Sequence, residues 1–189
     1  MRKICILTDN RYDIAESINL PDTEVKVISD NPDDENYSPS ELLPEYFKKE
    51  NFELVIIVDY ESNPSVEIFK YSKFIKIHPS ILPAFEQNSA IRDAYLAGVK
   101  VTGVTICEVK QNGIFGRIIS QYPVLIDNFT HYDQLESEIK TLEKILLPPV
   151  LKSIFENKIF DIVDFLGVSP CTKSACSQGC CGQKGALLE

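Results

Sequence analysis

The order of hydrophobic and polar positions predicts strands that alternate with helices along most of the chain. Residues 54–58, Leu-Val-Ile-Ile-Val, form an unbroken apolar run, which is typical of a strand covered by helices on both faces. Other strands are expected at residues 4–7, 24–28, 74–78, 99–109 and 118–125, and helices at residues 14–18, 42–47, 66–71, 89–97 and 132–156. This alternation predicts an α/β fold with a mainly parallel, helix-covered sheet of Rossmann type.

The pattern changes in the last third of the chain. Gly113 and Gly116 lie between two extended stretches, so we expect a terminal antiparallel strand pair there. From Tyr132 to about residue 156, apolar residues recur with the period of a long C-terminal helix. Pro148 and Pro149 fall inside this helix, and we expect them to kink it or break it briefly.

Length and composition predict one ordinary domain of a soluble globular protein. The chain has 189 residues, of which 44% are hydrophobic and 25% charged. We expect a domain at residues 1–166 and a cysteine-rich tail at residues 167–189. No apolar run is long enough for a membrane span, and the N-terminal residues are typical of a first strand rather than a signal peptide. A cytoplasmic protein is therefore expected.

The net charge restricts the class of partner. A formal charge of −9 argues against nucleic acid or an anionic membrane as the main partner. It does not exclude a small anion bound in a local basic pocket. A small-molecule substrate or ligand is therefore the expected partner, and the sequence leaves the oligomeric state open.

Residues 76–85, Lys-Ile-His-Pro-Ser-Ile-Leu-Pro-Ala-Phe, carry the most distinctive chemistry. His78 ends an expected strand, and Pro79 and Pro83 prevent that strand from pairing further. This order predicts an imidazole presented at the sheet edge, where open α/β sheets bind their ligands. The alternative is that His78 only closes the strand and hydrogen-bonds to a loop. These ten residues favour neither interpretation.

Four blocks of sequence together carry a resemblance to a known family. They are His-Pro-Ser-Ile-Leu-Pro-Ala-Phe at 78–85, Ala-Gly-Val-Lys-Val-Thr-Gly-Val-Thr at 97–105, Gly-Arg-Ile-Ile-Ser-Gln at 116–121 and Glu-Lys-Ile-Leu-Leu-Pro at 143–148. One block alone is weak, but four with matching order and spacing form a specific signal. Over roughly residues 74–151 the chain resembles the folate-dependent formyltransferases, and among them the phosphoribosylglycinamide formyltransferases.

The resemblance implies one-carbon transfer from 10-formyltetrahydrofolate to an amine in purine biosynthesis. The family uses an asparagine, a histidine and an aspartate. His78 stands at the histidine position, Lys76 at the asparagine position and Ile114 at the aspartate position. Lysine stabilises an oxyanion as a point charge without the geometry of an amide, and isoleucine cannot orient an imidazole. The resemblance therefore implies His78 and Lys76 as candidate catalytic residues, with impaired or altered catalysis.

Further positions depart from the family pattern. The first loop of the family is rich in glycine and binds phosphate, whereas residues 8–13 here read Thr-Asp-Asn-Arg-Tyr-Asp, with two carboxylates that repel an anion. We expect Arg11 in this loop to be solvated, and pairing with an anion is the alternative. Glu108, Asn112 and Asp127 are candidates to replace the missing aspartate.

The C-terminal tail holds the second group of candidate residues, Cys171, Cys176, Cys180 and Cys181. In a cytosolic protein, clustered cysteines favour metal or redox chemistry over structural disulfides. Four thiolates suit Zn²⁺ or an iron–sulfur cluster, although this spacing fits no standard pattern. A disordered thiol-bearing tail, redox chemistry and contacts with a partner are the alternatives. Cys5 and Cys107 are expected to be small core residues.

Two functions from different classes follow from the sequence. The first is a formyltransferase with impaired or altered catalysis, in which His78 is the surviving catalytic group. The second is a non-catalytic ligand- or metal-binding protein on the same fold, which uses the cysteine-rich tail.

Overall fold

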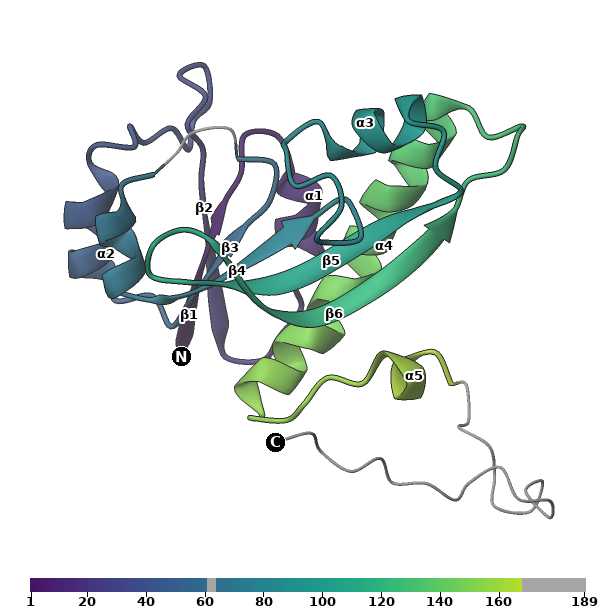
Figure 1. The fold of residues 1–189 in the computed structure, drawn as a ribbon. Coiled ribbons are helices and arrows are strands. Elements are labelled where there is room, and N and C mark those ends of the chain that lie inside the picture. Colours follow the sequence, from purple (N-terminus) through teal and green to yellow (C-terminus); the bar gives the residue numbers. More distant parts are fainter. Residues whose placement is uncertain (61–63, 168–189) are drawn as a thin grey trace, which may run out of the picture.

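The computed structural model describes residues 1–60 and 64–167, and a six-stranded sheet forms its centre (Figure 1). The strands are β1 (Arg2–Leu7), β2 (Thr23–Ile28), β3 (Leu54–Ile57), β4 (Lys73–His78), β5 (Val101–Val109) and β6 (Phe115–Leu125), in the spatial order β2-β1-β3-β4-β5-β6. Strands β1 to β4 pair in parallel, and β5 pairs antiparallel with both β4 and β6. The mainly parallel sheet with a terminal antiparallel pair is thus confirmed.

Helices cover both faces of this sheet (Figure 1). They are α1 (Tyr12–Ser17), α2 (Leu43–Glu50), the 3₁₀ turn η1 (Val66–Lys70), α3 (Ala90–Leu96), α4 (Tyr132–Phe155) and α5 (Ile162–Phe165). One hydrophobic core joins alternate residues of the strands to α1 and α4, and a second core joins the other residues to α2 and η1. Residues 66–71 were expected to form a helix, and the structure has the 3₁₀ turn η1 in their place.

Strand β4 carries polar side chains on one of these apolar faces. Ile75 and Ile77 belong to the core under α4, and Phe74 belongs to the core under α2. Because successive strand residues point to opposite faces, Lys76 and His78 share the face of Phe74. Cys107 of β5 pairs with Lys76 in register and is buried, as is Cys5, which confirms that these two cysteines are core residues.

The long helix α4 contains the two prolines at which a kink or a brief break was expected. It runs without a break through Pro148 and Pro149, and the Ser153 hydroxyl donates to the Pro149 carbonyl at 3.1 Å. The apolar residues around the prolines, Leu146, Leu147, Val150 and Leu151, are at most 1% exposed. Burial of this apolar stretch holds the helix together where the prolines supply no N–H donor.

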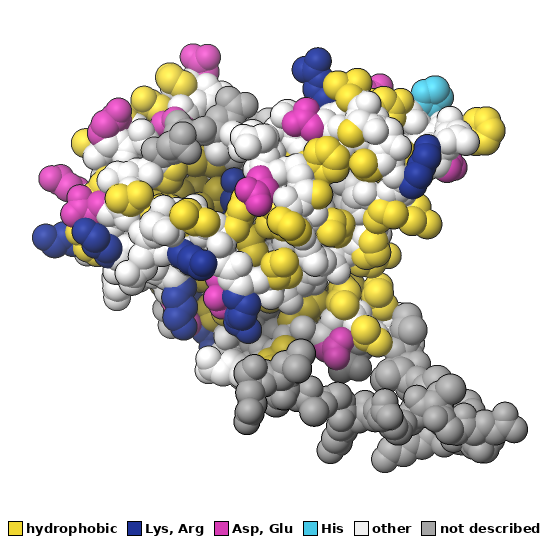
Figure 2. All heavy atoms as spheres, in the orientation of Figure 1, with side chains coloured by type: hydrophobic (Ala, Val, Ile, Leu, Met, Phe, Trp, Pro, Cys, Tyr) yellow, Lys and Arg dark blue, Asp and Glu magenta, His cyan; other side chains and the backbone are white. Residues whose placement is uncertain are grey.

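Strand β6 forms one edge of the sheet, and hydrophobic side chains gather over it (Figure 2). Ile118 and Leu125 of this strand are 43% and 75% exposed. None of the helices within residues 1–60 and 64–167 has the length and apolar character of a membrane span. The four cysteines of the expected tail, Cys171, Cys176, Cys180 and Cys181, lie outside the described residues.

Candidate functional site

A cleft of about 220 Å³ opens at the carboxyl edge of the parallel strands. Residues that follow β1 and β3 line it, together with the end of β4 and parts of α3 and α4. Strand β1 lies between β2 and β3, so the connections leave it in opposite directions, and open α/β sheets bind ligands where this happens. The charged side chains that line the cleft are Asp9, Asp59, Glu136, Lys76, Arg92 and Lys140. Acidic and basic groups are balanced, so the cleft is not a strong anion site.

His78 lines this cleft but is only 1% exposed. Its Nε2 lies 2.8 Å from the Phe85 carbonyl oxygen, and the Phe115 ring packs edge-on against the imidazole at 5.3 Å between centroids. A carbonyl only accepts, so Nε2 carries the proton and Nδ1 keeps its lone pair. Burial lowers the pKa of His78 below its ordinary value, although the Phe85 carbonyl opposes this. The imidazole is therefore neutral at pH 7.

His78 lies at the carboxyl edge of the sheet and lines the cleft, as predicted, but its imidazole is buried rather than exposed. The imidazole closes the strand and bonds to the following loop, as the alternative interpretation held, although it still borders the cleft. The physical reason is that Phe85 turns back under a positive φ of 54° and brings its carbonyl to the ring.

The loop after His78 is fixed to the antiparallel strands by side chains that sequence reasoning missed. The Thr105 hydroxyl donates to the Ser80 carbonyl at 2.6 Å and accepts from the Leu82 N–H at 3.2 Å. The Gln121 amide donates to the Leu82 carbonyl at 3.0 Å. Both side chains stood within matched blocks of sequence, which was the available signal. Thr105 and Gln121, from two of the four blocks, thus fix the conformation of the loop that follows His78.

Lys76 lies beside His78 in a site with few compensating charges. Its Nζ is 5.3 Å from the centroid of the Phe115 ring, so Phe115 contacts both residues. Burial lowers the pKa of Lys76 below its ordinary value, and Cys107 and Asp59 oppose this shift. Burial also raises the pKa of the Cys107 thiol to about 11, so this neighbour carries no charge at pH 7.

The position expected to hold an aspartate does not reach the imidazole. Ile114 is 59% exposed in the turn between β5 and β6, and the next residue, Phe115, contacts His78 instead. The strand pair therefore places an apolar ring where an orienting carboxylate is expected.

The three candidates for that missing carboxylate are engaged elsewhere. Glu108 accepts from Arg117 at 2.7 Å, and the Asn112 side chain accepts from the Ile114 N–H at 3.2 Å. Asp127 accepts from the Phe129 N–H at 2.8 Å, within its own turn. Within residues 1–60 and 64–167, the His78 side chain hydrogen-bonds to the Phe85 carbonyl and to none of these three side chains.

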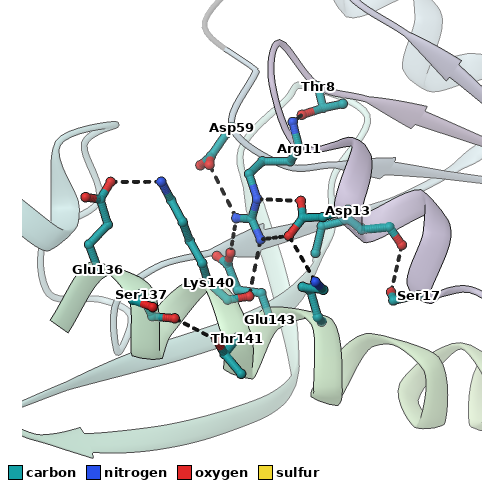
Figure 3. Close-up of polar contacts among 12 residues, drawn as sticks. Thr8, Arg11, Asp13, Ser17, Asp59, Glu136, Ser137, Lys140, Thr141 and Glu143 are labelled. Carbon is teal, nitrogen blue, oxygen red and sulfur yellow. Dashed lines mark hydrogen bonds and ion pairs between the residues drawn. The ribbon is translucent and has the colours of Figure 1, made fainter. Parts of the chain in front are cut away.

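Arg11 forms a buried ion cluster between α1 and α4 (Figure 3). Its side chain contacts Asp13 at 3.0 Å and Asp59 at 3.5 Å, pairs with Glu143, and donates to the Lys140 carbonyl at 3.2 Å. Arg11 is 4% exposed, so the expected solvated arginine is wrong. Three carboxylates surround the guanidinium, and it is therefore not available to bind an anionic ligand.

Glu143 is the buried partner in this cluster. It is 1% exposed, and its Oε1 has no hydrogen-bond partner among the described residues. Burial raises the pKa of Glu143 to about 7, although Arg11 opposes the shift. The pKa of Arg11 is raised: burial opposes this, but Asp13 and Glu143 outweigh it.

The described part of the chain offers no metal centre. Within residues 1–60 and 64–167, no three His, Cys, Asp or Glu side chains gather in an arrangement that holds a metal ion. The candidate ligands Cys171, Cys176, Cys180 and Cys181 lie outside this part, so the predicted Zn²⁺ or iron–sulfur site stays a prediction.

Comparison with known proteins places the cleft in a family context. Residues 9–151 match the family described as formyl transferase. Phosphoribosylglycinamide formyltransferase of Bacillus subtilis is 40% identical over 82 residues, which are 43% of this chain and 42% of that protein. Methionyl-tRNA formyltransferase of Ehrlichia chaffeensis is 28% identical over 141 residues, which are 71% of this chain and 46% of that protein. The chain thus spans less than half the length of these curated relatives.

Solved structures share the fold over nearly their whole length. Glycinamide ribonucleotide transformylase 1 of Symbiobacterium toebii superposes with a TM-score of 0.75 at 23% identity, covering 85% of this chain and 95% of that one. Phosphoribosylglycinamide formyltransferase of Bacillus halodurans gives a TM-score of 0.71 at 26% identity, covering 85% of this chain and 100% of that one. With its sheet order, its carboxyl-edge cleft and the match over residues 9–151, the chain belongs to the formyl transferase family.

Proposed function

We propose that the protein binds a formyl-donating folate in the cleft beside His78 and transfers the formyl group to an amine at an impaired rate. Family membership and the position of the cleft support the donor and the reaction. One observation carries the claim of impairment. The imidazole of His78 is held by the Phe85 carbonyl and the Phe115 ring, and neither carries the negative charge with which a carboxylate would stabilise the imidazolium formed on proton transfer.

The cleft fits part of such a donor. At about 220 Å³ it lies below the range of roughly 300–1,000 Å³ that is usual for drug-sized ligands, so it takes a bicyclic ring and not a whole folate. Asp59 and Asn10 offer acceptor and donor groups for ring nitrogens. The rest of the donor then lies outside the cleft.

The chemistry of formyl transfer needs a base for the attacking amine and a donor for the developing oxyanion. The lone pair on Nδ1 of His78 serves as the base. When a separate amine is the acceptor, protonated Lys76 serves as a point charge near the oxyanion. Loss of one orienting or donor group typically costs about a hundredfold to ten-thousandfold in rate. Formyl transfer is therefore expected to be slow but to depend on His78.

Two measurements on the full chain test this function. Calorimetric titration with tetrahydrofolate is expected to show binding. Transfer from 10-formyltetrahydrofolate to glycinamide ribonucleotide is expected to be slow, and slower still in His78→Ala. Exposed His131→Ala is the matched control, because it removes a histidine away from the cleft. Equal rates in the wild type and His78→Ala would exclude catalysis, and absence of binding would exclude the function altogether.

A second candidate is the non-catalytic ligand- or metal-binding protein, and the Arg11 cluster favours it. With its guanidinium neutralised by Asp13, Asp59 and Glu143, the first loop offers little to a phosphorylated substrate. In this case the cysteine-rich tail would bind Zn²⁺ or an iron–sulfur cluster in a cytoplasmic protein. Elemental analysis and the visible absorbance of the purified chain test this candidate, since a metal-free, colourless protein contradicts it.

A further inference from the structure

Lys76 lines the cleft and brings a primary amine to it. Its cross-strand neighbours in register are Ile57 on β3 and Cys107 on β5, and Phe115 lies over its Nζ. We propose that Lys76 is itself a formyl acceptor, so that the protein formylates its own Nζ when the donor binds. This proposal rests on the proposed function and names a substrate amine for the same cleft.

The surroundings of Lys76 do little to hold its amine in the charged form. Of the acidic groups that line the cleft, Asp59 pairs with Arg11 at 3.5 Å, Glu136 pairs with Lys140 at 2.9 Å, and Asp9 accepts from the Asp30 N–H at 3.2 Å. No ion pair of Lys76 occurs within residues 1–60 and 64–167. The Phe115 ring, with its centroid 5.3 Å from Nζ, is the neighbour that favours the ammonium form.

The apolar neighbours of Lys76 act in the opposite direction. Ile57 and Cys107 exclude water from the stem of the side chain, and desolvation lowers the pKa of its amine. A desolvated lysine without a strong counter-charge is the usual form of a nucleophilic lysine. The amine therefore has a larger neutral fraction at pH 7 than a lysine in an ion pair.

The reaction balances with groups that the cleft supplies. The lone pair of Nζ forms a bond to the formyl carbon, and the bond between that carbon and N10 of the folate breaks. Nζ loses one proton, for which the lone pair on Nδ1 of His78, two residues along the same face, is the acceptor, and N10 gains one proton. The products are formyl-lysine at position 76 and tetrahydrofolate, and no oxidant or reductant is needed.

Lys140 provides an internal control, because it lines the same cleft but its ammonium pairs with Glu136 at 2.9 Å. Among the described residues Lys76 has no such ion pair, and its stem is desolvated, so Lys76 is expected to be formylated faster than Lys140.

The experiment incubates the full chain with 10-formyltetrahydrofolate at pH 7 and maps formyl-lysine by peptide mass spectrometry over time. Lys76→Arg keeps a positive charge and removes the acceptor, and calorimetry with tetrahydrofolate shows whether each protein binds the folate. The expected result is one formyl group on Lys76 of the wild type and none on Lys140. Lys76→Arg is expected to bind the folate and to stay unmodified in the cleft.

The outcomes separate this proposal from the proposed function. If the wild type binds the folate and Lys76 stays unmodified, or reacts no faster than Lys140, self-formylation is overturned and the proposed function stands. If the wild type does not bind the folate, both are overturned. Preferential formylation of Lys76, dependent on bound donor, supports both.

Discussion

Replacement of Arg11 by methionine tests the buried ion cluster most sharply. Methionine keeps much of the length of the side chain but removes the charge that neutralises Glu143, which is 1% exposed. Removing one partner of a buried ion pair typically costs about 3–5 kcal/mol, because the other charge stays buried and unpaired. The half-exposed partners Asp13 and Asp59 add at most about 1 kcal/mol each.

The cost should depend on pH in a defined direction. The pKa of Glu143 is already raised to about 7, and without Arg11 it rises further. Below this pKa, Glu143 stays neutral in the folded variant and no buried charge is left unpaired. Arg11→Met is therefore expected to cost about 3–5 kcal/mol at pH 8 and only about 1–2 kcal/mol at pH 5.

Urea unfolding of the wild type and variant at both pH values measures these differences. Adding Glu143→Leu to Arg11→Met removes the unpaired carboxylate, so the double variant should recover to within about 1–2 kcal/mol of the wild type at pH 8. Arg117→Met is the matched control, since the exposed pair with Glu108 should cost less than about 1 kcal/mol. A loss of less than about 1 kcal/mol in the free energy of unfolding for Arg11→Met at pH 8 would refute the buried cluster and indicate that Arg11 is solvated.

Three further predictions follow from the same structure. The folded pKa of Glu143 lies above its ordinary value of 4.5, so the free energy of unfolding should fall as pH rises from about 4.5 to 7. Urea unfolding at stepped pH should show a flatter slope in Glu143→Gln, and an unchanged slope would contradict the raised pKa of Glu143. Ile114→Asp should leave the formyl-transfer rate within about threefold of the wild type, because residue 114 is 59% exposed away from His78; a larger gain would show that it reaches the imidazole. Gly103→Ala should lower the melting temperature and reduce the free energy of unfolding by more than about 2 kcal/mol, because the new Cβ would lie 2.0 Å from the Tyr122 carbonyl oxygen. An unchanged melting temperature would contradict this close packing of β5 and β6.

The fold followed from the sequence because its signals are local. The apolar run at residues 54–58 gave a buried central strand, and the period of apolar residues after Tyr132 gave α4. Of the kink or brief break expected at Pro148 and Pro149, the break is wrong, because packing of the helix against the sheet outweighs the loss of N–H donors. Propensity is a weak guide where tertiary burial decides.

The candidate site was predicted only in part, because its contacts join residues far apart in the chain. His78 and Lys76 border the cleft as the motif indicated, but nothing local showed that Phe115 would lie against both. Likewise the partner of Arg11, Glu143, lies more than a hundred residues away on another element. The spacing of residues along one strand indicates which of them share a face. The contacts that Phe115 and α4 make with residues far away in sequence can be seen only in the folded chain.

The central claim is that a formyl transferase scaffold has kept its cleft and its histidine while an aromatic ring has taken the place of the orienting carboxylate. The most direct test is single-turnover formyl transfer by the wild type and Phe115→Glu, with NMR titration of the His78 ring in both. We predict that the carboxylate introduced by Phe115→Glu raises the pKa of His78 and increases the transfer rate by at least about tenfold, and that adding His78→Ala abolishes the gain. A wild type that already transfers the formyl group rapidly, with no gain in Phe115→Glu, would contradict the claim.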